Sequence, residues 1–250
     1  MAYLLHLILP YKEGLVMVIY AIQLENDEFH KKLGGGLPAG TIALIRGEHG
    51  SGKSVICQRI TYGLLKNNVK VTYISTQLTT IDFIKQMSSL GYEIFRYIVN
   101  RQLLFIPVYP LIQEPKIRMD YIQRLMKARE LFDNDVIIID CLSSLVKYDI
   151  EIEKNKNNIT IKLMSFFKRL SALGKVIIMT ALDELEKDII EEIESASSFV
   201  AETSIKRIGT ELKNVMIIKK YNLAVGQYSK QITFRVEPKI GLVVEIAAVT

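Results

Sequence analysis

The sequence is poor in the residues that build disulfides, zinc sites and membrane spans. It has two cysteines, three histidines and no tryptophan among 250 residues. Cys57 and Cys141 lie far apart inside apolar runs, which favours buried free thiols in a reducing compartment. Neither they nor the histidines show metal-ligand spacing, and no apolar run reaches the roughly 18–20 residues that a membrane span needs. These absences predict a soluble cytoplasmic protein, with partner proteins as the route for any peripheral attachment to a membrane.

Composition and length bound the class of protein without choosing a partner. The net charge is +5, with 24% charged and 49% hydrophobic residues. A lysine-rich solvated face gives this charge as readily as a nucleic-acid surface does. The length predicts one α/β domain over residues 17–250. Residues 1–16 form an N-terminal extension for which three hypotheses stay open: Met17 as the true start, an extra strand, or a segment that faces a membrane or partner.

An apolar run followed by a glycine-rich loop is the clearest motif in the chain. Ile42 to Ile45 predicts a buried strand, and the phosphate-binding pattern G-x-x-x-x-G-K-[ST] follows. Gly47 and Gly52 let the backbone N–H groups point inward, and a helix starting near Lys53 adds a positive dipole end. Lys53 would reach the β- and γ-phosphates of ATP, and the Ser54 hydroxyl would ligate Mg²⁺. The predicted nucleotide-binding residues are Glu48, His49, Gly50, Ser51, Gly52, Lys53 and Ser54.

A second apolar run ends in a carboxylate. Residues 135–140 read DVIIID, which predicts a strand that delivers Asp140 to the carboxyl end of the sheet. With a phosphate loop upstream, we expect Asp140 to hold Mg²⁺ through water. The structural alternative is an ordinary turn aspartate. Another buried strand, Val176 to Thr180, ends at a hydroxyl that could sense the γ-phosphate.

The order of the predicted elements indicates the fold. Strands and helices alternate over residues 41–203, which predicts a mostly parallel, twisted central sheet with helices on both faces. Three further strands near 214–219, 231–236 and 242–246 read as an antiparallel meander. Several strands separate the phosphate loop from DVIIID. This α/β arrangement is that of the RecA-like P-loop fold rather than the kinase–GTPase class.

Two segments of the second half are strongly polar. We expect residues 147–158 to form a charged, asparagine-rich loop. Leu182, Leu185, Ile189 and Ile193 recur at helical spacing, and seven carboxylates lie between 183 and 194 against one lysine. The acidic helix is either a solvated face or a docking surface for a basic partner.

The motifs taken together resemble those of a known family. GGGLPAGT at 34–41 running into the phosphate loop, VTYIST at 71–76 and DVIIIDCLSSL at 135–145 are similar to KaiC-like ATPases, and among these to the accessory ATPases of the archaellum, the archaeal flagellum. The similarity covers about residues 26–246. It implies a homo-hexameric ring that binds ATP at subunit boundaries. It also implies the archaellum motor ATPase and membrane platform or scaffold proteins as partners, with ATP binding regulating assembly.

The chain departs from this family where catalysis is concerned. In KaiC-type ATPases the strand after the P-loop helix ends in paired glutamates, and one of them polarises the attacking water. Thr76 and Gln77 stand there instead, and loss of a general base costs about 10²–10⁴-fold in rate. The basic residues that a neighbouring subunit supplies in trans match Lys219 and Lys220, but Tyr221 replaces the family's arginine. These departures predict a nucleotide-binding switch with at most slow ATPase activity.

Two alternatives belong to other functional classes. A RecA/RadA-type DNA-binding ATPase would place a basic, glycine-rich loop where this chain has the acidic segment 183–194, which would repel phosphates. Nucleic acid is therefore not an expected partner. A KaiC-like signalling ATPase is the second alternative, and the single domain and the absent glutamates count against it.

Overall fold

The computed structural model describes residues 18–25, 28–108, 121–152 and 156–245. The predicted extension, residues 1–16, lies outside this range. At the start of the described chain, β1 (Ile19–Tyr20) pairs antiparallel with β2 (Leu37–Pro38) as a small separate sheet, and α1 (Phe29–Lys32) lies between them in sequence. The glycine-rich stretch around β2 thus stays out of the central sheet, because three glycines in left-handed conformation cannot continue a regular strand.

The described residues form a central sheet of nine strands in the order β11-β10-β9-β8-β3-β7-β6-β4-β5. The six strands from β8 to β5 are parallel, and β8 to β11 form an antiparallel meander. The RecA-like arrangement expected from the sequence is confirmed. The strands are β3 (Ile42–Gly47), β4 (Val71–Ser75), β5 (Leu103–Pro107), β6 (Val136–Asp140), β7 (Val176–Leu182), β8 (Phe199–Ile208), β9 (Glu211–Tyr221), β10 (Gln231–Glu237) and β11 (Gly241–Glu245).

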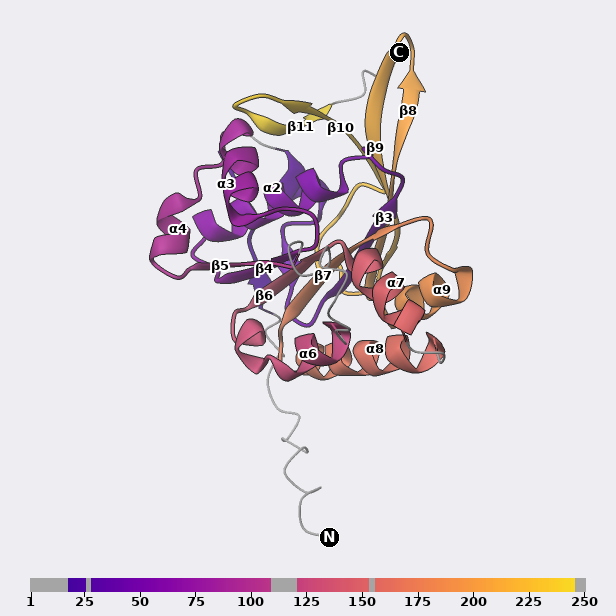
Figure 1. Cartoon of the computed structure of the whole chain (residues 1–250). Helices are drawn as coiled ribbons and strands as arrows, with labels where there is room; N and C mark the ends of the chain where they lie inside the picture. The colour runs from indigo at the N-terminus through magenta and orange to yellow at the C-terminus, as the bar shows by residue number, and fades with distance from the viewer. Residues whose placement is uncertain (1–17, 26–27, 109–120, 153–155, 246–250) are drawn as a thin grey trace, which may run out of the picture.

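Helices cover both faces of the parallel part of the sheet (Figure 1). On one face lie α2 (Lys53–Lys66), α3 (Thr80–Ser89) and α4 (Phe95–Val99). On the other lie α6 (Tyr121–Lys127), the 3-10 helix η1 (Arg129–Phe132), α7 (Leu142–Ile152), α8 (Lys156–Ala172) and α9 (Lys187–Ala196). Because side chains alternate along a strand, Ala43 and Ile45 enter the first core, and Ile42 and Leu44 enter the second. Two-sided burial explains why these strands read as continuous apolar runs.

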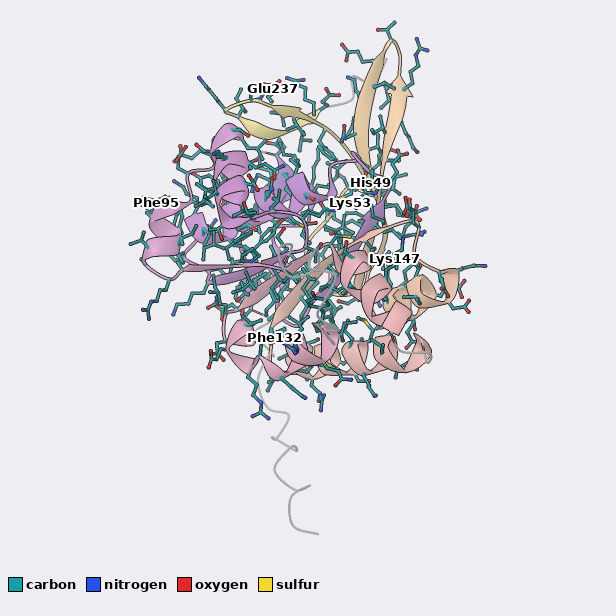
Figure 2. All side chains as sticks on the ribbon, in the orientation of Figure 1. His49, Lys53, Phe95, Phe132, Lys147 and Glu237 are labelled. Carbon is teal, nitrogen blue, oxygen red and sulfur yellow. The ribbon has the colours of Figure 1, made fainter. Side chains whose placement is uncertain are left out.

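The sheet order positions the candidate site. Strand β7 lies between β3, which carries the phosphate loop, and β6, which ends in Asp140. Since parallel strands end at the same edge, Gly47, Asp140 and Thr180 come together there. Figure 2 shows Lys53 and His49 close to the base of the hairpin formed by β8 and β9.

Three expected elements differ from the structure. The loop predicted at 147–158 is wrong, because α7 runs to Ile152 and α8 begins at Lys156. Leu142, Leu145 and Val146, which are buried at helical spacing, support α7. The acidic helix begins at Lys187 rather than near 182, since Leu182 extends β7 and pairs with Gly47. Strand β8 continues to Ile208, beyond residue 203 where the predicted alternation of strands and helices ends, because it forms one arm of a hairpin.

Candidate nucleotide-binding site

The phosphate loop joins β3 to α2 and depends on glycine at two close approaches. Gly47 has φ 152°, and a Cβ there would lie 2.1 Å from the carbonyl oxygen of Thr203. Gly52 has φ 91°, and its Cβ would lie 2.8 Å from the ring of Phe234, which is fully buried. Both positions therefore need glycine for space as well as for backbone conformation. Helix α2 then starts at Lys53 and aims its positive end at the loop.

The Lys53 ammonium group bonds to the backbone of the loop that precedes it. Its Nζ donates to the carbonyl oxygens of Gly47 at 2.8 Å and Glu48 at 2.6 Å. Burial lowers the pKa of Lys53, and nearby acidic groups, Asp140 among them, oppose that shift. The only amine that lines the described cavity is thus held where anionic oxygens would enter it.

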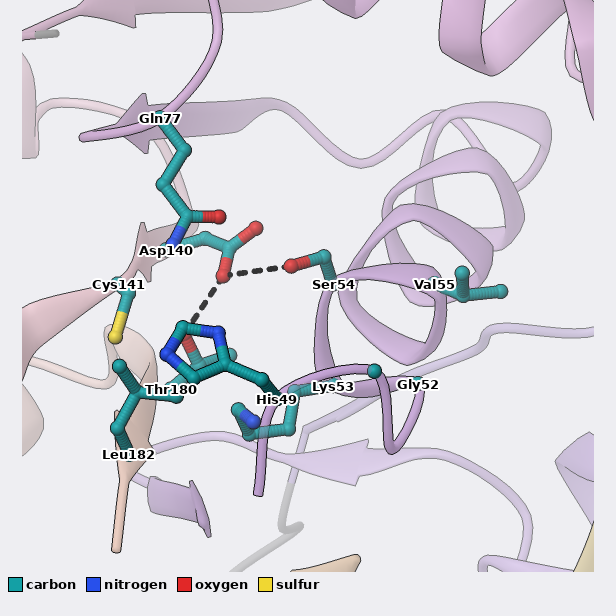
Figure 3. Close-up of a pocket in the computed structure, with 11 residues that line it drawn as sticks. His49, Gly52, Lys53, Ser54, Val55, Gln77, Asp140, Cys141, Thr180 and Leu182 are labelled. Carbon is teal, nitrogen blue, oxygen red and sulfur yellow. Dashed lines mark hydrogen bonds between the residues drawn. The ribbon is translucent and has the colours of Figure 1, made fainter. Parts of the chain in front are cut away.

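Asp140 is buried at the end of β6 and accepts three hydroxyl hydrogen bonds. Its Oδ1 accepts from Ser54 Oγ at 3.1 Å and from Thr180 Oγ1 at 2.7 Å, as Figure 3 shows. Its Oδ2 accepts from the Tyr73 phenol at 2.8 Å. Burial raises the pKa of Tyr73 well above its ordinary value, and the charge of Asp140 raises it further. The three donors hold the carboxylate in one orientation beside the first turn of α2.

Thr76 and Gln77, the two residues that the resemblance matches to paired glutamates, lie in different surroundings. Thr76 is buried, and its hydroxyl accepts from the backbone N–H of Cys141 at 3.0 Å, so it is part of the packing between β4 and the end of β6. Gln77 is exposed and lines the cavity, and its amide points toward Asp140 (Figure 3). Only Gln77 reaches the site. Cys141 also lines it, and both cysteines are free and buried, as expected.

The remaining loop residues divide between lining the cavity and holding the loop. His49, Gly50, Gly52, Lys53 and Ser54 line a cavity of about 180 Å³. Glu48 and Ser51 instead turn toward β8. The carboxylate of Glu48 accepts from the backbone N–H of Ile205 at 3.0 Å, and the hydroxyls of Ser51 and Thr203 lie 2.7 Å apart.

Some lining residues were not selected from the sequence. Val55 and Leu182 supply apolar walls, and Tyr73, which is not itself a lining residue, donates a hydrogen bond to Asp140. The one available signal for Tyr73 was a polar-tipped residue inside the otherwise buried strand 71–75. Its register beside β6 could not be read from the chain alone.

Lys219 and Lys220 lie on β9, outside the cavity of their own chain. Lys219 forms an ion pair with Glu202 at 2.9 Å. Lys220 Nζ donates to the carbonyl oxygens of Glu194 at 3.2 Å and Ser195 at 3.5 Å. Tyr221 is buried, and its phenol donates to Gly36 O at 3.0 Å. Burial raises the pKa of Tyr221 to about 12. These positions leave Lys219 as the more exposed of the two lysines.

The donor set fits a hard cation held with phosphates. The Ser54 hydroxyl and the Asp140 carboxylate present oxygens 3.1 Å apart next to Lys53, and Mg²⁺ prefers oxygen ligands with several waters retained. Elsewhere in the described residues, no group of three or more histidine, cysteine, aspartate or glutamate side chains is arranged for a metal ion. In the same part of the chain, no helix is long and apolar enough to cross a bilayer. Fold and site together define a P-loop nucleotide-binding protein of the RecA-like class.

Comparisons with known proteins agree with this class and narrow it. The family model for the ATPase KaiC matches residues 25–246. The archaeal flagellar ATP-binding protein FlaH of Methanocaldococcus jannaschii is 45% identical over 94% of this chain and 99% of its own length. That of Methanococcus voltae is 42% identical over 91% of this chain and 97% of its own. The crystal structure of flagellar accessory protein FlaH from M. jannaschii superposes with a TM-score of 0.86 and 44% identity, covering 92% of this chain and all of that one. The chain belongs to the KaiC family of ATPases and, within it, to the FlaH proteins.

Proposed function

We propose that the chain is an ATP-binding regulatory component of the archaellum, in which nucleotide binding rather than turnover carries the function. The archaellum role is supported by the FlaH relatives, which are named as archaeal flagellar ATP-binding proteins. The emphasis on binding is supported by one observation. Gln77 occupies the position from which a glutamate would activate water, and Thr76 beside it is turned into the core.

The binding half of the site is complete. Lys53 would exchange its carbonyl partners for β- and γ-phosphate oxygens, and the loop N–H groups and the N-terminus of α2 favour the same negative charge. Ser54 would ligate Mg²⁺ directly, and Asp140 would hold it through water. The ion supplies charge neutralisation at the phosphates when bound.

The catalytic half lacks the glutamate that would accept a proton from the attacking water. Asp140 is the only carboxylate among the described residues that line the cavity, and three hydroxyl donors already occupy it. The amide of Gln77 can orient water but cannot take its proton at a useful pH. Since a positioned general base contributes about 10²–10⁴-fold, hydrolysis is expected to be slow or negligible.

Ring assembly and partner docking extend the proposal. A homo-hexameric ring would place Lys219 and Lys220 of one copy toward the nucleotide of the next. Tyr221 cannot stand in for the missing arginine, because it is buried and bonded to Gly36 O. The weaker charge stabilisation that results is consistent with a switch. In this proposal, ATP binding controls the ring and its docking to the archaellum motor ATPase and membrane platform proteins.

Calorimetry and steady-state phosphate release on the purified chain test the proposal. Wild-type protein should bind ATP with Mg²⁺ and release phosphate barely above background, and Lys53→Ala should lose ATP binding. Turnover of several per second that Lys53→Ala abolishes would contradict the proposal, because the protein would then act by hydrolysing ATP. Deletion of the gene for this chain in a host that forms archaella should abolish them. Intact archaella in the deletion strain would contradict the archaellum role.

A further inference from the structure

Strands β8 and β9 extend beyond the strands that flank them in the sheet, β3 and β10. Pairing between β3 and β8 stops at Gly47 with Thr203, and pairing between β10 and β9 stops at Phe234 with Asn214. The two strands go on pairing with each other out to Ile208 and Glu211. Figure 1 shows this hairpin projecting from the body of the molecule. We call residues 204–213 the hairpin tip.

The hairpin tip is both apolar and basic. Ile205 and Ile208 are 41% and 42% exposed, and Leu212 is 74% exposed. Lys206 and Arg207 are also exposed, and neither forms an ion pair within the described part of the chain. Exposed apolar side chains grouped with free cations indicate a surface that buries against an acidic partner.

The same chain carries a surface of the opposite charge. Helix α9 buries Ile189, Ile190 and Ile193 against the sheet and turns its carboxylates outward. One of these carboxylates pairs with the only lysine of the helix, Lys187, at 3.5 Å. The acidic face consists of the exposed carboxylates on α9 and in the segment just before it, namely Asp183, Glu184, Glu186, Asp188, Glu191 and Glu192. Figure 1 shows α9 well apart from the hairpin tip, so the two surfaces of one copy are placed for different neighbours.

We propose that the hairpin tip of one copy docks on the acidic face of α9 in a second copy of this chain. The two surfaces differ, so the contact is heterologous, and repetition of it builds a ring or a filament rather than a twofold dimer. Arg207 pairs with Leu212 across the hairpin and so lies on the same face, where Arg207 meets the carboxylates of α9 and Leu212 supplies the apolar centre. Lys206 lies on the other face and adds positive charge to the tip. This identifies the basic partner of the acidic helix as the neighbouring copy.

The hairpin is also bonded to the phosphate loop. Its backbone at Ile205 donates to the Glu48 carboxylate at 3.0 Å, Thr203 contacts Ser51 at 2.7 Å, and Asn214 Nδ2 donates to Gly50 O at 3.5 Å. Binding of phosphates to the loop would therefore influence the conformation of the hairpin through these three contacts. Association is expected to strengthen with ATP and Mg²⁺, a dependence that rests on the proposed function. The contact itself does not.

Charge exchange tests the contact. Light scattering and sedimentation would measure self-association of the full chain with and without ATP and Mg²⁺. K206E/R207E and E191K/E192K should each weaken association by about tenfold or more. The combined fourfold variant should associate within a few-fold of wild type, because the charges are exchanged across the contact. Lys66 and Lys70, exposed at the opposite edge of the sheet, give the matched control K66E/K70E, which should associate as wild type does.

Each result decides the question. Failure of the fourfold variant to recover, or equal weakening by K66E/K70E, would overturn the contact. So would a loss of single-stranded DNA binding in K206E/R207E with self-association unchanged, which would make the tip a nucleic-acid surface. ATP affinity measured on the same samples separates the two proposals. If a charge-reversal variant loses association but keeps its ATP affinity, the loss is due to the contact alone. If wild-type protein does not bind ATP, the proposed function is contradicted and the contact is not.

Discussion

Tyr73 donates its phenolic hydrogen to Oδ2 of Asp140 at 2.8 Å, across the pairing of β4 with β6. Its ring centroid lies 4.8 Å from that of Phe83, so the phenol is fixed by the aromatic core on the α2 face. Ser54 and Thr180 occupy the other carboxylate oxygen. The core of one sheet face therefore orients the carboxylate proposed to hold Mg²⁺ through water.

Tyr73→Phe should separate metal-dependent from metal-independent binding. The substitution keeps the ring packing and removes one hydrogen bond from Asp140, with a stability loss of about 1 kcal/mol. Calorimetry should show ATP affinity reduced several-fold with Mg²⁺ and unchanged with chelator. Tyr62→Phe, which alters a tyrosine stacked on Tyr92 instead, is the matched control. An equal loss of ATP affinity with and without Mg²⁺ would contradict the role of Tyr73 in orienting Asp140.

Gln77→Glu should restore part of the missing chemistry. A carboxylate at this cavity-lining position could accept the proton of an attacking water, so we expect phosphate release to rise by about 10- to 100-fold, within the range of general bases. Gln77→Leu is the comparison, with ATP affinity retained and turnover at the wild-type background or below it. A glutamate variant no faster than the leucine variant would show that Gln77 is not what limits hydrolysis.

Two glycine substitutions should separate backbone strain from steric clash. Gly50 has φ 77° and open space around its missing Cβ, so Gly50→Ala should lose about 1 kcal/mol of unfolding free energy. Gly52→Ala adds the clash with buried Phe234, and the total loss should be about 2–4 kcal/mol. Urea denaturation would measure both. Equal losses would mean that the ring shifts without resistance.

Tyr221 predicts a stability change at alkaline pH. Burial raises its pKa from 10.0 to about 12, so the folded state binds the phenolic proton more tightly than the unfolded state does. This contribution, on the order of 1–3 kcal/mol, is complete below about pH 10 and is lost as the pH rises toward 12. Urea unfolding at several pH values should show a shallower decline for Tyr221→Phe than for wild type, and parallel curves would contradict the linkage.

The central sheet could be predicted because its signals are local. Helix α2 begins at Lys53, where the sequence predicts it, and the strand expected before Thr76 is Val71–Ser75, because burial on both faces makes such strands read as apolar runs. The second half was harder. Helix α7 contains charged residues that resemble a loop, and only tertiary burial of Leu142 and Leu145 reveals its inner face.

The candidate site divides in the same way. Lys53, Ser54 and Asp140 follow from motifs whose spacing reflects phosphate chemistry, and the structure brings them together. The sequence could not tell that Gln77 reaches the cavity whereas Thr76 is turned inward, because that depends on how β4 packs beside β6. The hydrogen bond from Tyr73 to Asp140 depends on the same packing, so the sequence could not predict it either.

The contacts that hold the phosphate loop also govern when the site can form during synthesis. Ser51 meets a residue 152 positions later, Glu48 one 157 positions later, and Gly50 one 164 positions later. A nascent chain that ends after β7 would contain the whole phosphate-binding motif but none of these supports. Such distant contacts form late and slowly. Nucleotide capture should therefore appear only when nearly the entire chain has emerged, which would make ATP binding a checkpoint for completed folding.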